Sequence, residues 1–359
     1  MTRDQPQSFR DELSGAVSRR TVLLVVGVLL VQVLFIASYV GAFHHPTPHG
    51  VPVDVVAPAP ETTRLVSTLD ATAGHPLAAR AVGSEAAAAA AVRSDRTAGA
   101  LVVSRRGSHD TILVAEGGGA ALARGVTRSL SAIEAARGRA VRVDDLVPLQ
   151  AGDYRGLSGF YLVIGWIVGG YLVAALLGIA AGSRPATTRR AVIRLGAIVA
   201  YALVSGLTGA VVVDQWLGAL TGHFWALAGL GFLLVAAAAA TTMAFQVLAG
   251  VIGIGITVLV FVVAGNPSAG GAYQLHLLPA FWRLISSGLP NGAGVDTVRR
   301  IVYFGGRGVT DHLLTICAWF VAGAAVAVVA SRHHHRRGGL PADAVAAISA
   351  SPAGTLRPH

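Results

Sequence analysis

The sequence contains no lysine and few charged residues of any kind. All 28 basic residues are arginine, so the lysine-containing loop Gly-x-x-x-x-Gly-Lys-[Ser/Thr] cannot occur and the chain by itself cannot be an ATPase of that kind. Charged residues make up 13% of the 359 residues, whereas soluble domains contain roughly 25%. With 53% hydrophobic residues, this balance excludes an ordinary soluble enzyme, a disordered scaffold and a collagen-like fibre. Much of the chain is therefore expected to lie in lipid.

Catalytic and metal-binding patterns are also missing. The single cysteine, Cys317, lies in an apolar run and excludes a disulfide within the chain. No His-Glu-x-x-His, Cys-x-x-Cys, Gly-x-Ser-x-Gly or EF-hand pattern occurs. We therefore predict no catalytic residues, no metal site and no cofactor, in a protein that is not an enzyme. The net charge of +10 does not indicate nucleic-acid binding, because no basic stripe with interleaved aromatic residues is present.

Long uncharged segments predict six transmembrane helices. The first, at Thr21–Val40, is long enough to cross a hydrocarbon core of about 30 Å. The other five are Gly159–Ala181, Leu195–Val213, Phe224–Thr242, Phe245–Ala264 and Leu313–Ala330. The fourth and fifth are nearly continuous, which predicts a tight hairpin around Met243. No span carries an ionisable residue near its middle, so coupling to protons or cations is disfavoured and energy for transport must come from another protein.

Arginines in short flanking segments predict the orientation of the spans. They are frequent in the N-terminal tail, between spans two and three, and after span six, but almost absent from the turn at Asp214–Gly222. We therefore predict that the spans lie in a bacterial plasma (inner) membrane and that both termini are on its cytoplasmic side. Residues 1–20 are predicted to form a cytoplasmic amphipathic elbow, and residues 331–359 a basic cytoplasmic tail.

Residues 41–158 are predicted to form an extracytoplasmic α+β domain inserted between the first two spans. Apolar runs at 51–56, 99–103 and 110–115 predict strands, the last two joined by a hairpin. The alanine-rich segments 84–93 and 120–136 predict helices, with Ser84 as an N-cap.

A second long segment between predicted spans, residues 265–312, precedes the last span. It is predicted to be an external re-entrant or interfacial segment, because leucine and aromatic residues between Pro279 and Pro290 suit a short helix at the membrane surface. The short helix is expected at Leu277–Leu289, and a further helix at Gly294–Phe304.

This organisation resembles the permease of type-2 ATP-binding-cassette (ABC) exporters, in particular the bacterial branch related to phage-infection-protein-like membrane proteins. The resemblance rests on Glu85–Val103, on Gly156–Tyr171 and on Gly265–Gly305. Within the last stretch, the sequences GNPS, LPAFWR and PNGAGVD look like signature blocks of that branch.

The resemblance implies a homo- or heterodimeric permease in the lipid bilayer, powered by a separate nucleotide-binding ATPase subunit. The loop that would contact the ATPase is Ser183–Arg194. Its candidate coupling residues are Arg184, Arg189, Arg190 and Arg194. The same arginines also fit a role in topology and in binding lipid phosphates. The candidate residues of an external gate are Pro279, Phe281, Trp282, Pro290 and Gly294.

Two functions are compatible with these observations. The first is a permease subunit that exports an amphipathic or lipid-like substrate, since uncharged spans suit such cargo. The alternative is a non-transporting envelope scaffold or surface receptor, in which the extracytoplasmic domain binds a partner and the spans serve only as anchors. A membrane-bound enzyme is disfavoured because no acid–base or metal-ligating group of residues is present.

Overall fold

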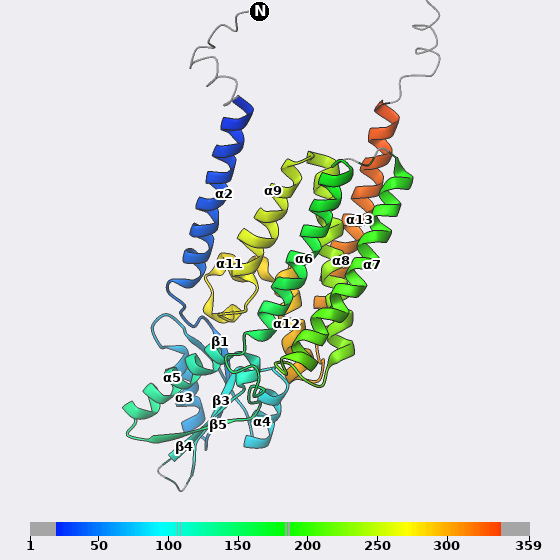
Figure 1. The fold of residues 1–359 in the computed structure, drawn as a ribbon. Helices are drawn as coiled ribbons and strands as arrows, with labels where there is room; N and C mark the ends of the chain where they lie inside the picture. The colour runs from blue at the N-terminus through cyan, green and yellow to red at the C-terminus, as the bar shows by residue number, and fades with distance from the viewer. Residues whose placement is uncertain (1–18, 106, 108, 184, 186, 339–359) are drawn as a thin grey trace, which may run out of the picture. The chain divides into compact units, whose positions relative to one another are not determined.

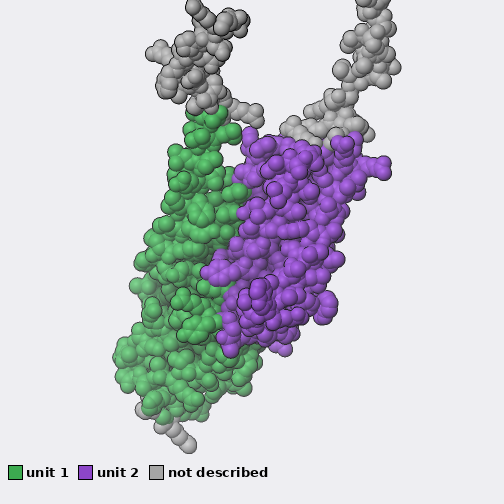
Figure 2. Space-filling view, viewed as in Figure 1, with its two compact units in different colours: residues 1–149, 154–157, 258–295 green, residues 150–153, 158–257, 296–359 purple. Residues whose placement is uncertain are grey.

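The computed structural model describes residues 19–105, 107, 109–183, 185 and 187–338. The chain divides into two compact units, which Figure 2 distinguishes by colour. Unit 1 comprises residues 1–149, 154–157 and 258–295, and unit 2 comprises the remaining residues. Most of the predicted N-terminal elbow, residues 1–18, lies outside the described residues, as do Arg184 and the end of the C-terminal tail.

Five of the described helices are long and apolar enough to cross a membrane. They are α2 (Arg19–Phe43), α6 (Ser158–Ala181), α7 (Thr188–Ala210), α8 (Phe224–Ala249) and α13 (Thr310–Gly338) (Figure 1). A π-helical segment, η2 (Val211–Trp216), continues α7. These helices match five of the six predicted spans and are compatible with a multi-pass membrane protein.

The predicted hairpin around Met243 is wrong. Helix α8 continues through Met243 to Ala249, because no glycine or proline interrupts it there. The chain instead turns at Gly250, whose φ of +64° favours glycine.

The predicted fifth span, at Phe245–Ala264, is consequently not a single helix. Its first residues belong to α8, and the next apolar helix extends only from Ile252 to Ser268, or about 26 Å at 1.5 Å per residue. This helix consists of α9 (Ile252–Val258), the π-helical segment η3 (Leu259–Ala264) and α10 (Gly265–Ser268). It is followed by η4 (Leu275–Leu277), α11 (Ala280–Ser286) and α12 (Pro290–Tyr303).

In unit 2, α8 is the central helix and packs against α6, α7 and α13. Small residues allow the close approach of backbones that membrane helices use. A Cβ atom added at Gly170 of α6 would lie 2.6 Å from the Val235 carbonyl oxygen, and one at Gly206 of α7 would lie 2.5 Å from the Ala228 oxygen. These glycines therefore set the distance between α8 and its neighbours.

We expect Gly170→Leu to lower the melting temperature of the detergent-solubilised protein by roughly 5–10 °C, because overpacking costs about 1–3 kcal/mol or more. Gly165→Leu, on the same helix, is the matched control, since a Cβ there would meet nothing within 4 Å. Thermal unfolding followed by circular dichroism measures the difference. Equal melting temperatures for the two variants would contradict the close packing of α6 on α8.

The α+β domain lies in unit 1 and contains a five-stranded sheet with the order β2-β1-β3-β4-β5. The strands are β1 (Val51–Val56), β2 (Leu77–Ala81), β3 (Gly99–Val102), β4 (His109–Val114) and β5 (Ala140–Asp145). Strand β1 pairs in parallel with β2 and with β3, while β4 runs antiparallel to β3 and parallel to β5. The predicted strands and the hairpin are confirmed, whereas β2 and β5 were not predicted.

Helices cover both faces of this sheet (Figure 1). The helices α3 (Glu61–Asp70) and α5 (Ala120–Ala136) share one core with β1, β3 and β4, which includes Val53, Ile112 and Leu130. Helix α4 (Glu85–Arg93) packs on β1, β3 and β4 through other buried residues, among them Ala88 and Val92. Both predicted helices are confirmed, and the Ser84 hydroxyl oxygen accepts a hydrogen bond from the Ala87 N–H at 3.2 Å, as expected of an N-cap.

Candidate functional site

The candidate gate residues lie on α11 and at the start of α12. Pro279 is the N-cap of α11, on which Phe281 is 59% exposed and Trp282 is half-buried. Pro290 and Gly294, by contrast, are buried in the first turns of α12. The helix predicted to begin at Gly294 begins four residues earlier, since proline is tolerated at the first position of a helix.

The two asparagines of the chain, Asn266 and Asn291, meet in the core of unit 1. Nδ2 of Asn291 donates to Oδ1 of Asn266 at 2.9 Å and to the carbonyl oxygen of Phe261 at 3.0 Å. Nδ2 of Asn266 in turn donates to the hydroxyl of Tyr39, on α2, at 2.9 Å. Asn291 is completely buried, and its Oδ1 has no hydrogen-bond partner among the described residues. A polar link therefore joins α2, α12 and the apolar helix at Ile252–Ser268, which we call the shortened apolar helix.

Two features of the backbone make this link possible. The carbonyl of Phe261 lies in η3, where the π-helical turn changes the usual backbone pairing. A Cβ atom at Gly265 would lie 2.5 Å from Oδ1 of Asn291, so only glycine allows the two segments to come this close. The sequence blocks GNPS and PNGAGVD are thus adjacent in the structure.

The segment after the shortened helix contacts the α+β domain within unit 1. Oε1 of Gln274 accepts a hydrogen bond from the N–H of Leu122, in the first turn of α5, at 2.9 Å. The N–H of His49 donates to the carbonyl of His276 at 2.9 Å. The domain is thereby tied to the same segment that carries the gate residues.

A loop was predicted at Ser183–Arg194, but Arg189, Arg190 and Arg194 lie in helix α7, which already begins at Thr188. Arg184 lies outside the described residues. Thr187 caps this helix by accepting a hydrogen bond from the N–H of Arg190 at 3.2 Å. The side chains of Arg189 and Arg190 are exposed in its first turns. Arg194 instead donates to the carbonyl oxygens of Gly182, at 2.8 Å, and of Ala181, which end α6. Arg189 and Arg190 are therefore available to a partner, whereas Arg194 has a structural role.

A cluster of charged residues connects α12 to α13 in unit 2. A carboxylate oxygen of Asp296 lies 2.6 Å from Nε of Arg300 and 2.9 Å from Nε2 of His312. Burial would raise the pKa of Asp296, but the hydrogen bond to His312 and the charges of Arg299 and Arg300 bring it well below its ordinary value. Asp296 is therefore ionised and holds the two helices together at this end.

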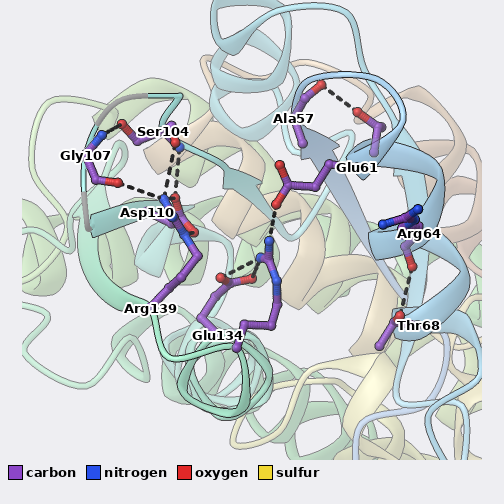
Figure 3. A network of polar contacts seen from close by, with 11 residues as sticks. Ala57, Glu61, Arg64, Thr68, Ser104, Gly107, Asp110, Glu134 and Arg139 are labelled. Atoms are coloured by element: carbon purple, nitrogen blue, oxygen red, sulfur yellow. Dashed lines mark hydrogen bonds and ion pairs between the residues drawn. The ribbon is translucent and has the colours of Figure 1, made fainter.

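The α+β domain contains a second, larger network of buried charges (Figure 3). Asp110 and Glu134 are both completely buried, on β4 and α5. Oδ1 of Asp110 accepts hydrogen bonds from Nη2 of Arg139 at 2.6 Å and from the N–H of Ser104 at 2.8 Å. Arg139 also donates to the carbonyl oxygens of Ser104, at 3.2 Å, and of Gly107, at 3.1 Å. This guanidinium therefore connects the β3–β4 turn to the end of α5.

A second arginine holds the other carboxyl group. Nη1 of Arg137 lies 2.7 Å from both carboxyl oxygens of Glu134, while its Nη2 binds Glu61 at the start of α3. Because both buried carboxyl groups are engaged by arginines and shielded from solvent, neither can reach a substrate. The network fastens α3, α5 and β4 to one another and is not a catalytic centre.

The two buried carboxyl groups have opposite pKa shifts. Burial would raise the pKa of Asp110, but the hydrogen bonds from Arg139 and Ser104 outweigh it and lower the pKa. Burial raises the pKa of Glu134 despite the opposing effect of Arg137, and a hydrogen bond with Asp110 raises it further. Such a difference is expected when two neighbouring acids share one hydrogen bond.

Comparison with protein-family models, with curated proteins and with solved structures finds no match to this chain. The site must therefore be judged from its own residues. Asn266 and Asn291 lie in the sequence blocks GNPS and PNGAGVD, but neither was among the predicted site residues. Their rarity was the available signal, since the chain has no other asparagine.

Proposed function

We propose that the chain is the permease subunit of an ABC-type exporter, which moves an amphipathic or lipid-like substrate and is powered by a separate ATPase. The observation that carries this proposal is the buried contact between Asn266 and Asn291 at the end of a shortened, π-bulged apolar helix. A chain that only anchors a domain needs nothing more than continuous apolar helices. Transporters, in contrast, use interrupted helices whose polar groups are satisfied inside the protein.

The proposed topology has six spans across a cell membrane, of which Ile252–Ser268 is the shortest. Both termini are on the cytoplasmic side. At 17 residues this helix is at the lower limit for crossing a bilayer. The α+β domain would then face the outside. Its contact with Gln274 would link it to the gate region.

The exposed arginines of α7 are the proposed contact with the ATPase. The first turn of this helix contains no acidic residue. Positive charges near a helix N-terminus oppose the helix dipole, by about 0.3–1 kcal/mol each. Arg189 and Arg190 therefore do not stabilise α7, but an acidic partner surface would compensate for their placement. A permease dimer would present two such contacts.

The test is to isolate the full chain from its native membranes after mild cross-linking and to identify any ATP-binding polypeptide retained with it. We expect an ATPase to copurify, and the reconstituted complex to move a fluorescent lipid only when ATP is hydrolysed. Arg190→Glu should weaken the association at least about tenfold, since it reverses a charge at the contact.

Arg332→Glu is the control for the change in net charge, because Arg332 is exposed on α13 and lies outside the proposed contact. If no ATP-binding protein is retained, and the lipid moves equally with and without ATP, the chain is not a permease of this kind. If Arg190→Glu and Arg332→Glu weaken the association with the ATPase equally, α7 is not the site of contact.

A further inference from the structure

A groove of about 590 Å³ lies between α3 and α5 of the α+β domain, within the size range of small-molecule sites. Its apolar lining consists of Pro60, Leu65, Ile133 and Ala136. Pro60 and Ala136 are exposed, and Ile133 is half-buried, so apolar surface is accessible within the groove. The α3 side extends from Pro60 to Thr68, or about 12 Å along a helix axis. The groove can therefore accommodate an extended apolar chain.

The polar lining of the groove is dominated by two arginines, Arg64 and Arg137. Arg137 is engaged by Glu134 and by Glu61, which is the one acidic residue of the lining. Because Glu61 is committed in this way, it does not neutralise Arg64, three residues further along α3. Among the described residues, no carboxylate forms an ion pair with Arg64, whose side chain is exposed. The groove thus combines an apolar surface with a guanidinium that forms no ion pair with a described carboxylate.

We propose that this groove binds a single-chain amphiphile with a carboxylate head group, such as a medium-chain fatty acid. Arg64 binds the carboxylate, since a guanidinium presents paired N–H donors that match the two oxygens. The hydrocarbon chain lies along Pro60, Leu65 and Ile133. A neutral amphiphile forms no ion pair with Arg64, and a small anion leaves the apolar surface exposed to water, so both bind less well.

The buried charge network determines the shape of this site. Arg137 and Glu61 link α5 to α3 across the groove, so the network fixes the spacing between the two walls. Binding requires neither ATP nor a second protein. The inference therefore does not rest on transport, and the two proposals can fail separately.

The test uses the full chain in phosphatidylcholine nanodiscs and a dodecanoic acid analogue that carries a photoreactive diazirine. Cross-linked peptides are identified by mass spectrometry, and only labelling of α3 and α5 is scored, because the probe also enters the bilayer. We expect saturable labelling there, which unlabelled decanoate displaces. The corresponding fatty alcohol should label at least about tenfold less, the loss expected when one charge-assisted hydrogen bond is removed.

Two variants test the two halves of the groove. Arg64→Gln removes the charge and Ala136→Trp fills the apolar space, and each should reduce the labelling of α3 and α5 at least about tenfold. Arg93→Gln is the matched control, because Arg93 is an exposed arginine on α4. Labelling that is confined to the spans, or unchanged in both groove variants, would overturn the proposal. So would displacement of the probe by inorganic phosphate as efficiently as by decanoate.

Discussion

Replacing Arg139 with methionine is expected to destabilise the α+β domain by about 3–5 kcal/mol, because removing one partner of a buried ion pair leaves the other charge uncompensated. The charge left behind is Asp110, which is completely buried and lies next to Glu134. The donors to the carbonyls of Ser104 and Gly107 are lost as well. Hydrogen exchange of the β4 and α5 amides, measured on the full chain in nanodiscs, should accelerate by roughly 10²–10⁴-fold at neutral pH.

The pH dependence of this effect identifies its cause. A carboxyl group whose pKa is lowered in the folded state stabilises the protein above its ordinary pKa, and that contribution is lost as the pH falls through the lowered value. Asp110 behaves in this way in the wild type. Without Arg139, burial raises the pKa of Asp110, so acidification allows the buried group to become neutral. The difference between Arg139→Met and the wild type should therefore shrink as the pH is lowered from 7 towards 4.

Glu134 contributes in the opposite direction. Its pKa is raised in the folded state, so its contribution is present below its ordinary pKa and is lost as the pH rises through the raised value. The variant Glu134→Gln should remove this loss of stability above the ordinary pKa of the carboxyl group, because its amide remains neutral and can still donate to Asp110.

The double variant Arg139→Met/Asp110→Asn separates the lost charge pair from a general loss of packing. It removes the buried charge as well as its partner, so protection of β4 should partly return. Arg93→Met, on the exposed surface of α4, should leave exchange in β4 and α5 unchanged. If Arg139→Met exchanges within about twofold of the wild type at neutral pH, the buried pair does not stabilise the domain.

The parts of the fold that follow from a local pattern were predicted correctly. The strand at 51–56 is a nearly continuous apolar run, and the helix at 85–93 has both an alanine-rich sequence and a capping serine. The edge strand β5 was missed because most of its residues are exposed and it contains Arg142, Asp144 and Asp145, so it has little apolar pattern. Its position comes from parallel pairing with β4, which a local sequence pattern cannot show.

The errors in the membrane-spanning part also have physical causes. Hydropathy is nearly uniform from Phe224 to Ala264, so composition alone could not place the turn. The positive φ of Gly250 fixes it instead. In the same way, arginines close to the end of a span indicated a loop, although Thr187 caps a helix that already contains Arg189 and Arg190.

The candidate site, which is the contact between Asn266 and Asn291, could be predicted only in part from the sequence. Charge, the usual signal of a functional residue inside a membrane protein, is absent from it. Asn266 and Asn291 are neutral and separated by 25 residues. Their contact depends on the close approach at Gly265, which is a property of the folded backbone. The predicted gate residues came from the family resemblance, and the structure leaves one of them, Phe281, exposed.

Replacing Asn291 with leucine is expected to slow ATP-driven substrate movement by at least about tenfold, while association with the ATPase is retained. Leucine has the same number and branching of side-chain heavy atoms as asparagine but cannot donate to Oδ1 of Asn266 or to the carbonyl of Phe261. Each buried polar group that loses its partner costs about 1–3 kcal/mol. Because the lost bonds join α12 to the shortened apolar helix, the position of the gate segment should change while α7 does not.

The contact can be tested as a pair. If the two amides act through each other, Asn266→Leu should impair transport in the same way, and Asn266→Leu/Asn291→Leu should be no worse than either single variant. Gln32→Leu is the control for replacing an amide by a hydrocarbon within an apolar helix, since Gln32 is exposed on α2. Transport would be measured as ATP-dependent movement of a fluorescent lipid in vesicles that contain both subunits. Wild-type rates in Asn291→Leu would show that the asparagine contact serves only to hold α12 in place, and the interrupted helix would then no longer support a transport function.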